Sequence, residues 1–143
     1  MTSGFNLWVW PISGEREPLR VVETLLNAMH GRFSPDGKWL AYASDELGTM
    51  QVFVQPFRAT GNRKQISTTG GSEPRWRRDG GELYSLASDL KLMSVSLPRS
   101  DAFRAGVPQP LFETRFPLTS NSYRRNYAVA ANGQRFRVST ESR

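Results

Sequence analysis

The chain has 143 residues, about the size of one ordinary domain, and its 19 Lys and Arg against 13 Asp and Glu give a formal net charge of +6. The absence of cysteine excludes disulfides, thiol catalysis and Cys-ligated zinc or iron–sulfur centres. No apolar run approaches the ~20 residues of a membrane helix, so we expect no membrane segment in this chain. Its arginines are scattered, which favours an arginine-rich surface over a nucleic-acid partner.

The first predicted elements are strands at residues 5–12 and 18–22, which we interpret as the third and fourth strands of a four-stranded unit. The motif LWVWPI at residues 7–12 recurs as VFVQPF at residues 52–57 and, more loosely, as LMSVSL at residues 92–97. In the first two copies a proline stands where the strand ends, a position at which its missing N–H does little harm. This recurrence indicates an internal repeat.

The most informative stretch is FSPDGKWLAYAS, residues 33–44. Its SPDG segment is a turn, because Pro presets φ, Asp bonds its own backbone and Gly accepts a positive φ. The residues that follow are largely apolar on both faces, as in a strand buried between two layers. The same corner recurs in residues 76–85 and 129–138, with Asp36, Asp79 and Asn132 at equivalent positions.

A repeat of ~40–45 residues made of short alternating strands is typical of a β-propeller blade. The predicted strands of one complete blade are residues 31–34, 38–44, 50–57 and 64–67. Those of the next blade are residues 74–77, 81–87, 91–97 and 109–113. Residues 126–130 and 134–139 supply only a first and a second strand. The predicted fold is all-β, a partial propeller of four-stranded antiparallel blades with two full blades and two half blades.

We therefore interpret residues 1–143 as a single propeller segment. It divides into a half blade at 1–30, a blade at 31–73, a blade at 74–122 and a half blade at 123–143.

These repeats resemble the PD40 (WD40-like) repeats of TolB-like β-propellers, most specifically at residues 33–44. Residues 52–57, 70–80 and 127–136 resemble the C-terminal propeller region of bacterial, acidobacterial-type, eukaryotic-like serine/threonine protein kinases. The resemblance implies a bacterial protein, cytoplasmic or periplasmic, with a binding or sensing role downstream of a kinase domain. The chain itself has no Gly-rich loop, His-Arg-Asp or Asp-Phe-Gly motif.

Two explanations fit the complementary half blades. The chain is the C-terminal part of a longer propeller, which we favour. Alternatively, residues 5–22 of one copy pair with residues 126–139 of another, and self-association completes a six-bladed ring with two-fold symmetry.

Candidate catalytic groups are few. The single histidine, His30, falls in a predicted loop, and no Gly-x-Ser-x-Gly elbow accompanies it. Asp36, Asp79 and Asn132 recur once per blade, and turn formation explains them without a metal. We predict no catalytic residues, no metal and no cofactor. The expected function is a non-catalytic propeller module for protein or ligand interaction. The alternative is a propeller piece of a serine peptidase or another hydrolase whose catalytic domain lies elsewhere.

The candidate interaction site is a basic rim formed by five arginines, Arg75, Arg77, Arg78, Arg124 and Arg125. Arginines clustered at the mouth of a channel suit a protein or a small anionic ligand, through carboxylates or phosphates. The competing interpretation is that Trp76 packs between blades and that the arginines pair with Glu73 and Asp79.

Overall fold

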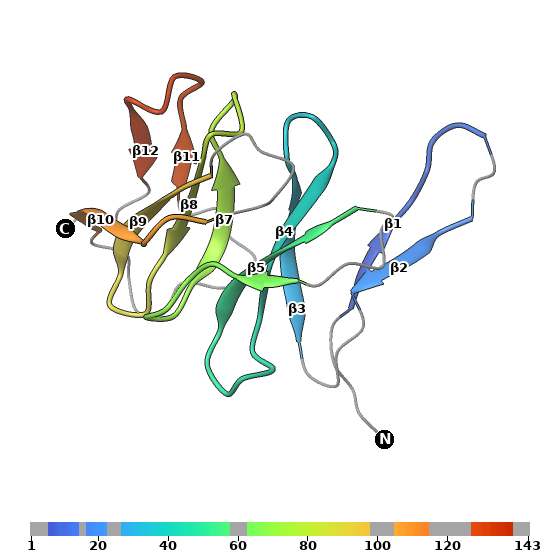
Figure 1. Ribbon diagram of the computed structural model, residues 1–143, viewed down its shortest axis with the longest axis horizontal. Coiled ribbons are helices and arrows are strands. Elements are labelled where there is room, and N and C mark those ends of the chain that lie inside the picture. The colour runs from blue at the N-terminus through green and yellow to red at the C-terminus, as the bar shows by residue number, and fades with distance from the viewer. Residues whose placement is uncertain are drawn as a thin grey trace.

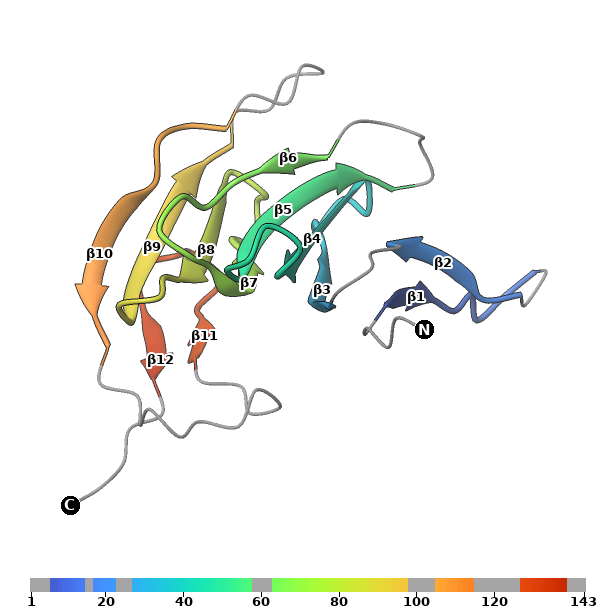
Figure 2. The same ribbon diagram turned by 90° about the horizontal axis from the view of Figure 1, so that it is seen from below.

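The computed structural model describes residues 6–14, 17–22, 27–57, 63–97, 105–114 and 127–138. All of the regular structure in these ranges is β-strand, arranged as four antiparallel sheets (Figure 1). The sheets follow one another in chain order around an arc (Figure 2). The predicted all-β architecture is confirmed.

Two of the sheets are complete four-stranded blades. The first blade comprises β3 (Ala28–Phe33), β4 (Trp39–Ser44), β5 (Gln51–Pro56) and β6 (Lys64–Gln65), paired in that order. The second blade comprises β7 (Ser72–Trp76), β8 (Glu82–Leu86), β9 (Lys91–Ser96) and β10 (Gln109–Glu113), also paired in order. Every neighbouring pair is antiparallel, as expected for a meander of short strands joined by tight turns.

The other two sheets are two-stranded and lie at the two ends of the arc. The N-terminal half blade pairs β1 (Leu7–Val9) with β2 (Leu19–Val22), and the C-terminal half blade pairs β11 (Tyr127–Val129) with β12 (Phe136–Val138). Figure 2 shows β1–β2 beside the first blade and β11–β12 beside the second. The prediction of two full blades and two half blades is confirmed.

The innermost strands of the two complete blades start earlier than expected. β3 begins at Ala28 and β7 at Ser72, where the sequence pattern places starts at residues 31 and 74. Each strand contains an irregularity in its pairing, and within it lies a residue of positive φ, His30 (58°) or Glu73 (50°). An extra residue in a bulge breaks the period-two alternation of apolar and polar residues. The sequence pattern therefore predicts only the part of each strand that follows the bulge. The prediction that His30 lies in a loop is therefore wrong.

The hairpins between first and second strands close identically. Their glycines, Gly37, Gly80 and Gly133, have φ values of 74°, 74° and 71°. Each glycine N–H donates to the carbonyl three residues earlier, at 2.8–2.9 Å. The oxygen of the preceding side chain, on Asp36, Asp79 or Asn132, accepts the N–H two residues after it, at 3.0, 2.8 and 3.0 Å. The turn chemistry predicted for these corners is confirmed.

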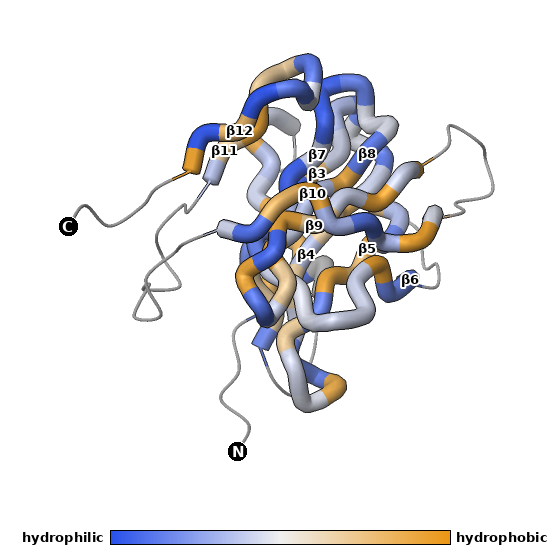
Figure 3. Tube along the Cα trace, turned by 90° about the vertical axis from the view of Figure 1, so that its left-hand side faces the viewer, coloured by the Kyte–Doolittle hydropathy of each residue, from blue (hydrophilic) through white to orange (hydrophobic). Residues whose placement is uncertain are grey.

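The apolar core lies between consecutive sheets. One cluster joins the first blade to the second. In it, Ala41, Val52 and Val54 of the first blade, together with Ile66 just after β6, pack against Leu83, Val95 and Leu97 of the second. Tyr84, Leu86 and Leu92 of the second blade pack with the C-terminal half blade, through Tyr127, Val129, Phe136 and Val138. Along the blades in Figure 3, apolar segments of strand alternate with polar turns. Each complete blade is thus covered on both faces by its neighbours, which explains why both faces of its central strands are apolar.

Polar contacts near the innermost strands also join successive sheets. The Trp76 indole N–H donates to the Arg32 carbonyl at 3.0 Å, and the Tyr127 hydroxyl donates to the Glu73 carbonyl at 2.6 Å. The Glu73 N–H donates to Nδ1 of His30 at 3.4 Å, so the two bulges are in contact. Two of these bonds satisfy the backbone N–H and carbonyl of Glu73, which the bulge in β7 removes from the regular ladder.

Candidate functional site

Arg75 of the predicted basic rim is held between the second blade and the C-terminal half blade. Its Nη1 donates to the Pro74 carbonyl at 3.0 Å, and its Nη2 lies 3.9 Å from the Glu73 carboxylate. Its guanidinium carbon stands 5.4 Å from the centre of the Tyr127 ring, close enough for a cation–π contact. Arg75 therefore helps to dock one sheet on the next.

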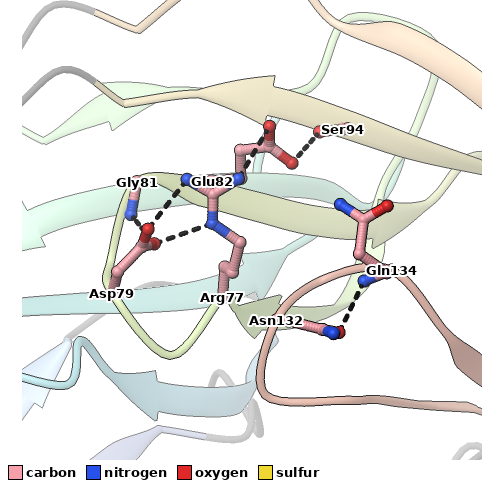
Figure 4. A network of polar contacts seen from close by, with 7 residues as sticks. All are labelled: Arg77, Asp79, Gly81, Glu82, Ser94, Asn132 and Gln134. Atoms are coloured by element: carbon pink, nitrogen blue, oxygen red, sulfur yellow. Dashed lines mark hydrogen bonds and ion pairs between the residues drawn. The ribbon is translucent and has the colours of Figure 1, made fainter.

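Arg77 is bound by two carboxylates (Figure 4). It forms a bidentate pair with Asp79, at 2.7 and 3.0 Å, and its Nη1 lies 3.1 Å from Glu82. The hydrogen bond to Asp79 raises the pKa of Arg77 above its ordinary value. Glu82 also accepts from the Ser94 hydroxyl at 3.1 Å. With its charge compensated on both sides, Arg77 stiffens the β7–β8 hairpin.

Of the other three arginines of the predicted basic rim, the structure describes one. Arg78 is exposed at the tip of the β7–β8 hairpin. Arg124 and Arg125 lie outside the described residues. Trp76 packs between the blades, against the cluster that joins them. The pairing of Arg75 with Glu73 and of Arg77 with Asp79 matches the competing interpretation, and the basic rim stays a prediction.

No catalytic arrangement emerges around the titratable groups of the described ranges. Nδ1 of His30 accepts a backbone N–H, and no group of three or more His, Cys, Asp or Glu able to hold a metal occurs in those ranges. Asp45 accepts from the backbone and side-chain N–H groups of Asn27, at 2.8 and 2.9 Å, which lowers the pKa of its carboxyl. No helix within the described residues is long and apolar enough to cross a bilayer.

The feature that sequence reasoning missed is the outer face of the N-terminal half blade. Trp8, Trp10 and Ile12 are 57%, 67% and 88% exposed, while Leu7, next to Trp8, packs against the first blade. Arg20 on β2 stands over the Trp8 ring, 5.8 Å from its centre. Exposed aromatic and aliphatic side chains gathered in one segment, here on β1 and in the residues directly after it, mark an interaction surface. We call Trp8, Trp10 and Ile12 the apolar ribbon.

A second open apolar area lies at the other end of the arc. Phe136 of β12 meets Tyr84 and Phe112 edge-on, with ring centres 5.0 and 5.5 Å away. Leu111 and Phe112 on β10 nevertheless remain 45% and 38% exposed. Phe112 therefore contacts the C-terminal half blade without being fully covered by it.

The sequence contains a signal for the apolar ribbon, though not for its exposure. Leu7 and Val9 alternate with Trp8 and Trp10, so both faces of this strand are apolar, as in a strand covered on two sides. The structure covers one of these faces and leaves the other open.

Comparison with known proteins supports the architecture. A scan against known protein families finds no match, and no curated protein matches the chain by sequence. Among solved structures, TolB from Acinetobacter baumannii is similar, with a TM-score of 0.69 and 18% sequence identity. The match covers 96% of this chain and 32% of the TolB chain, so the chain spans about a third of TolB's length. The TolB-like propeller fold expected from the repeats is confirmed.

Proposed function

We propose that the chain is a non-catalytic interaction module, a propeller arc that presents the apolar ribbon to a protein partner. The observation that supports this proposal is the exposure of Trp8 on β1 and of Trp10 and Ile12 in the segment that follows it. Large aromatic side chains at protein interfaces supply much of the binding free energy, because they bury a large area with few rotatable bonds. A strand with such a face suits recognition of another extended segment.

Binding to an array of extended peptides, each about 10 residues long, tests this function. We expect the chain to retain peptides with alternating apolar side chains, and the Trp8→Ser, Trp10→Ser double variant to lose them. Leu47→Ser is the matched control, because Leu47 is 61% exposed in the β4–β5 turn, away from the ribbon. Equal retention by the double variant and the control contradicts the proposed surface. Turnover of peptide or ester substrates by the purified chain contradicts the non-catalytic assignment.

The basic rim is a second proposed contact, for a small anionic ligand or an acidic peptide. Exposed Arg78 supports it, whereas the ion pairs of Arg75 and Arg77 reduce the charge they can offer. We expect the Arg78→Glu, Arg125→Glu double variant to lose retention on an acidic-ligand matrix at matched ionic strength. The Lys64→Glu, Lys91→Glu double variant, which reverses two exposed charges away from the rim and lowers the net charge by the same amount, is the control for a general effect of net charge. Unchanged retention in the double variant contradicts the rim.

We further propose that the arc belongs to a larger protein resembling a bacterial serine/threonine kinase. The repeat sequences at residues 33–44, 52–57 and 70–80 support this, as does an arc that spans 32% of the TolB chain. The neighbouring coding sequence tests it. Kinase motifs upstream, a Gly-rich loop, His-Arg-Asp and Asp-Phe-Gly, are the expected result. A Gly-x-Ser-x-Gly elbow downstream instead favours the hydrolase alternative.

A further inference from the structure

The corner at residues 130–133 differs from the two other inner corners in one functional group. Its backbone geometry matches theirs, but the side chain before the glycine is the amide of Asn132, where the complete blades have the carboxylates of Asp36 and Asp79. Asn132 is exposed at the tip of its hairpin, and Figure 4 shows it with Gln134 at this corner. An amide and a carboxylate at the same place in a turn react differently.

An asparagine followed by glycine can react with its own backbone, and asparagine is among the chemically labile residues. The backbone nitrogen of Gly133 bonds to Cγ of Asn132, which closes a succinimide ring and releases the side-chain nitrogen as ammonia. Water then opens the ring. It breaks either the new bond to Cγ, which leaves aspartate, or the bond to the original peptide carbonyl, which leaves isoaspartate with the main chain running through the side chain.

Asn132 is the asparagine best placed for this reaction. It is the only one in the chain that precedes a glycine, whose nitrogen has no Cβ beside it to hinder the attack. Its Oδ1 atom accepts the Gln134 N–H at 3.0 Å. Attack on Cγ places negative charge on this oxygen, and a donor already aimed at it stabilises that charge. The corner therefore combines an unhindered nucleophile with a polarised amide.

The two aspartate corners are protected from the same reaction. A carboxylate repels a nucleophile and has no good leaving group, so aspartate must be protonated before it can form the ring. The Ser34 hydroxyl and the Lys38 N–H donate to Asp36, at 2.6 and 3.0 Å, and these hydrogen bonds lower the pKa of its carboxyl. Asp79 is paired with Arg77 at 2.7 and 3.0 Å. Both corners therefore serve as internal controls.

We propose that Asn132 is a deamidation site and that the fold accepts one of its two products. Aspartate at residue 132 reproduces the corners of the complete blades, where a carboxylate accepts the N–H two residues further on, at 3.0 and 2.8 Å. The ionised acceptor strengthens that hydrogen bond. Isoaspartate instead adds a methylene group to the main chain within the turn. The hydrogen bonds of Gly133 N–H to the Ala130 carbonyl and of Ala130 N–H to the Arg135 carbonyl, at 2.9 and 2.8 Å, depend on the original length.

The isoaspartate form should lose the contact between the last hairpin and the second blade. A Cβ added at Gly133 would lie 2.5 Å from the Tyr84 hydroxyl and 2.8 Å from Cδ of Arg77, so the corner has no room to expand toward that blade. A longer turn must move outward. It then takes with it Phe136 of β12, whose ring meets Tyr84 edge-on at 5.0 Å. Deamidation thus yields a native-like population and a loosened one.

The fold should also slow the reaction. The Gly133 nitrogen must lose its proton to act as a nucleophile, and in the folded chain its N–H is bound to the Ala130 carbonyl. A free peptide of residues 127–138 does not hold this bond. We expect the folded chain to deamidate at Asn132 more slowly than the peptide does, and sooner than at any other asparagine of the chain.

Incubation of the folded chain in mildly alkaline water labelled with heavy oxygen tests the site. Ring opening leaves one heavy oxygen at each converted residue, and peptide mass spectrometry locates it. Residue 132 should gain label first among the asparagines. The free peptide, incubated in parallel, gives the unrestrained rate. Asn132→Asp is the matched control and should gain little label at residue 132, in step with residues 36 and 79.

Two further measurements distinguish the products. Asn132→Asp should have a urea midpoint equal to that of the parent chain or slightly higher, because it is the accepted product. Chromatography separates the isoaspartate fraction after incubation. Hydrogen exchange in this fraction should be faster than in the parent at β11 and β12 and unchanged at β4 and β5, which lie in the first blade.

The proposal fails if another asparagine gains label first, or if residue 132 is unlabelled when the peptide is fully converted. It also fails if Asn132→Asp is less stable than the parent, or if β11 and β12 exchange equally in the isoaspartate fraction and the parent. A folded chain that gains label as fast as the peptide contradicts the restraint by the Ala130 carbonyl.

Discussion

Two buried tyrosines differ in what their hydroxyl groups contact. The Tyr127 hydroxyl donates to the Glu73 carbonyl at 2.6 Å, at the inner bulge of the second blade. The Tyr42 hydroxyl is buried and has no hydrogen-bond partner in the described part of the chain. Burial raises the pKa of both groups, so both are neutral at physiological pH.

We expect Tyr127→Phe to lower the free energy of unfolding by about 1–2 kcal/mol, because it leaves a buried carbonyl without its donor. Tyr42→Phe is the matched control and should lower stability less, since its hydroxyl makes no well-formed hydrogen bond in the described part of the chain and only the Arg63 guanidinium interacts with it. Urea unfolding of the two variants beside the parent chain measures the difference. Equal losses of stability in the two variants would contradict this account.

Asp45 should make part of the stability depend on pH. Its folded pKa is lowered by the two N–H groups of Asn27, so its contribution is complete above the unfolded pKa of about 3.9 and is lost as pH falls through the folded value. Asp45→Asn keeps only one acceptor oxygen for two donors. We expect the variant to be less stable than the parent at pH 7 and the difference to shrink below about pH 4. Urea midpoints measured from pH 2.5 to 7 check this, and a gap that stays constant across the range would argue against it.

At the scale of the hairpin, the three inner corners share one backbone geometry but differ in their surroundings. A Cβ added at Gly37 would meet nothing within 4 Å, whereas one at Gly133 would lie 2.5 Å from the Tyr84 hydroxyl and 2.8 Å from Cδ of Arg77. Tyr84 is buried and Arg77 is bound by two carboxylates, so neither can move away at low cost. The corner at Asn132–Gly133 therefore both turns the chain and packs against the second blade.

We expect Gly37→Ala to lower the free energy of unfolding by about 1–2 kcal/mol, because a residue with a Cβ is strained in a left-handed backbone. Gly133→Ala should lower the free energy of unfolding by about 1–3 kcal/mol more than Gly37→Ala, because the added methyl group also overpacks against Tyr84 and Arg77. Thermal unfolding followed by circular dichroism compares the two. A Gly133→Ala variant as stable as Gly37→Ala would show that the last hairpin does not pack on Tyr84.

The elements that could be predicted from sequence are those with regular period and turn chemistry. In the complete blades, the predicted bounds of the second and third strands agree with the observed ones within one residue, because Asp-Gly corners and alternating apolar residues define these strands locally. The predicted starts of the first strands lie two or three residues after the observed ones. His30 and Glu73 have a left-handed backbone at the bulges, and neither residue type predicts that conformation from sequence.

The candidate site was harder to predict because its chemistry depends on neighbours distant in sequence. Arg75 and Arg77 look like free cations in a basic stretch, but Tyr127 and Glu82 reach them from other strands. Trp8 and Trp10 look like core residues, and their exposure depends on which sheet lies beside them. The local sequence pattern predicts where a strand lies. Which other sheet packs on each face of that strand depends on how all the sheets are arranged along the arc.

For the molecule as a whole, stability should be graded along the arc. The central strands β4, β5, β8 and β9 are hydrogen-bonded on both edges and packed on both faces, so their amides should exchange slowest with deuterium. β1 and β12 each lack a partner on one edge within the described ranges, and they should open locally at a lower free energy.

Hydrogen exchange followed residue by residue measures this gradient. The amides of β1 and β12 should exchange through local opening, with rates that depend little on denaturant, whereas those of β5 and β8 should exchange only when the chain unfolds as a whole. Equal protection of the end strands and the central strands would contradict the gradient, because it would mean that a strand with one paired edge is held as firmly as a strand with two.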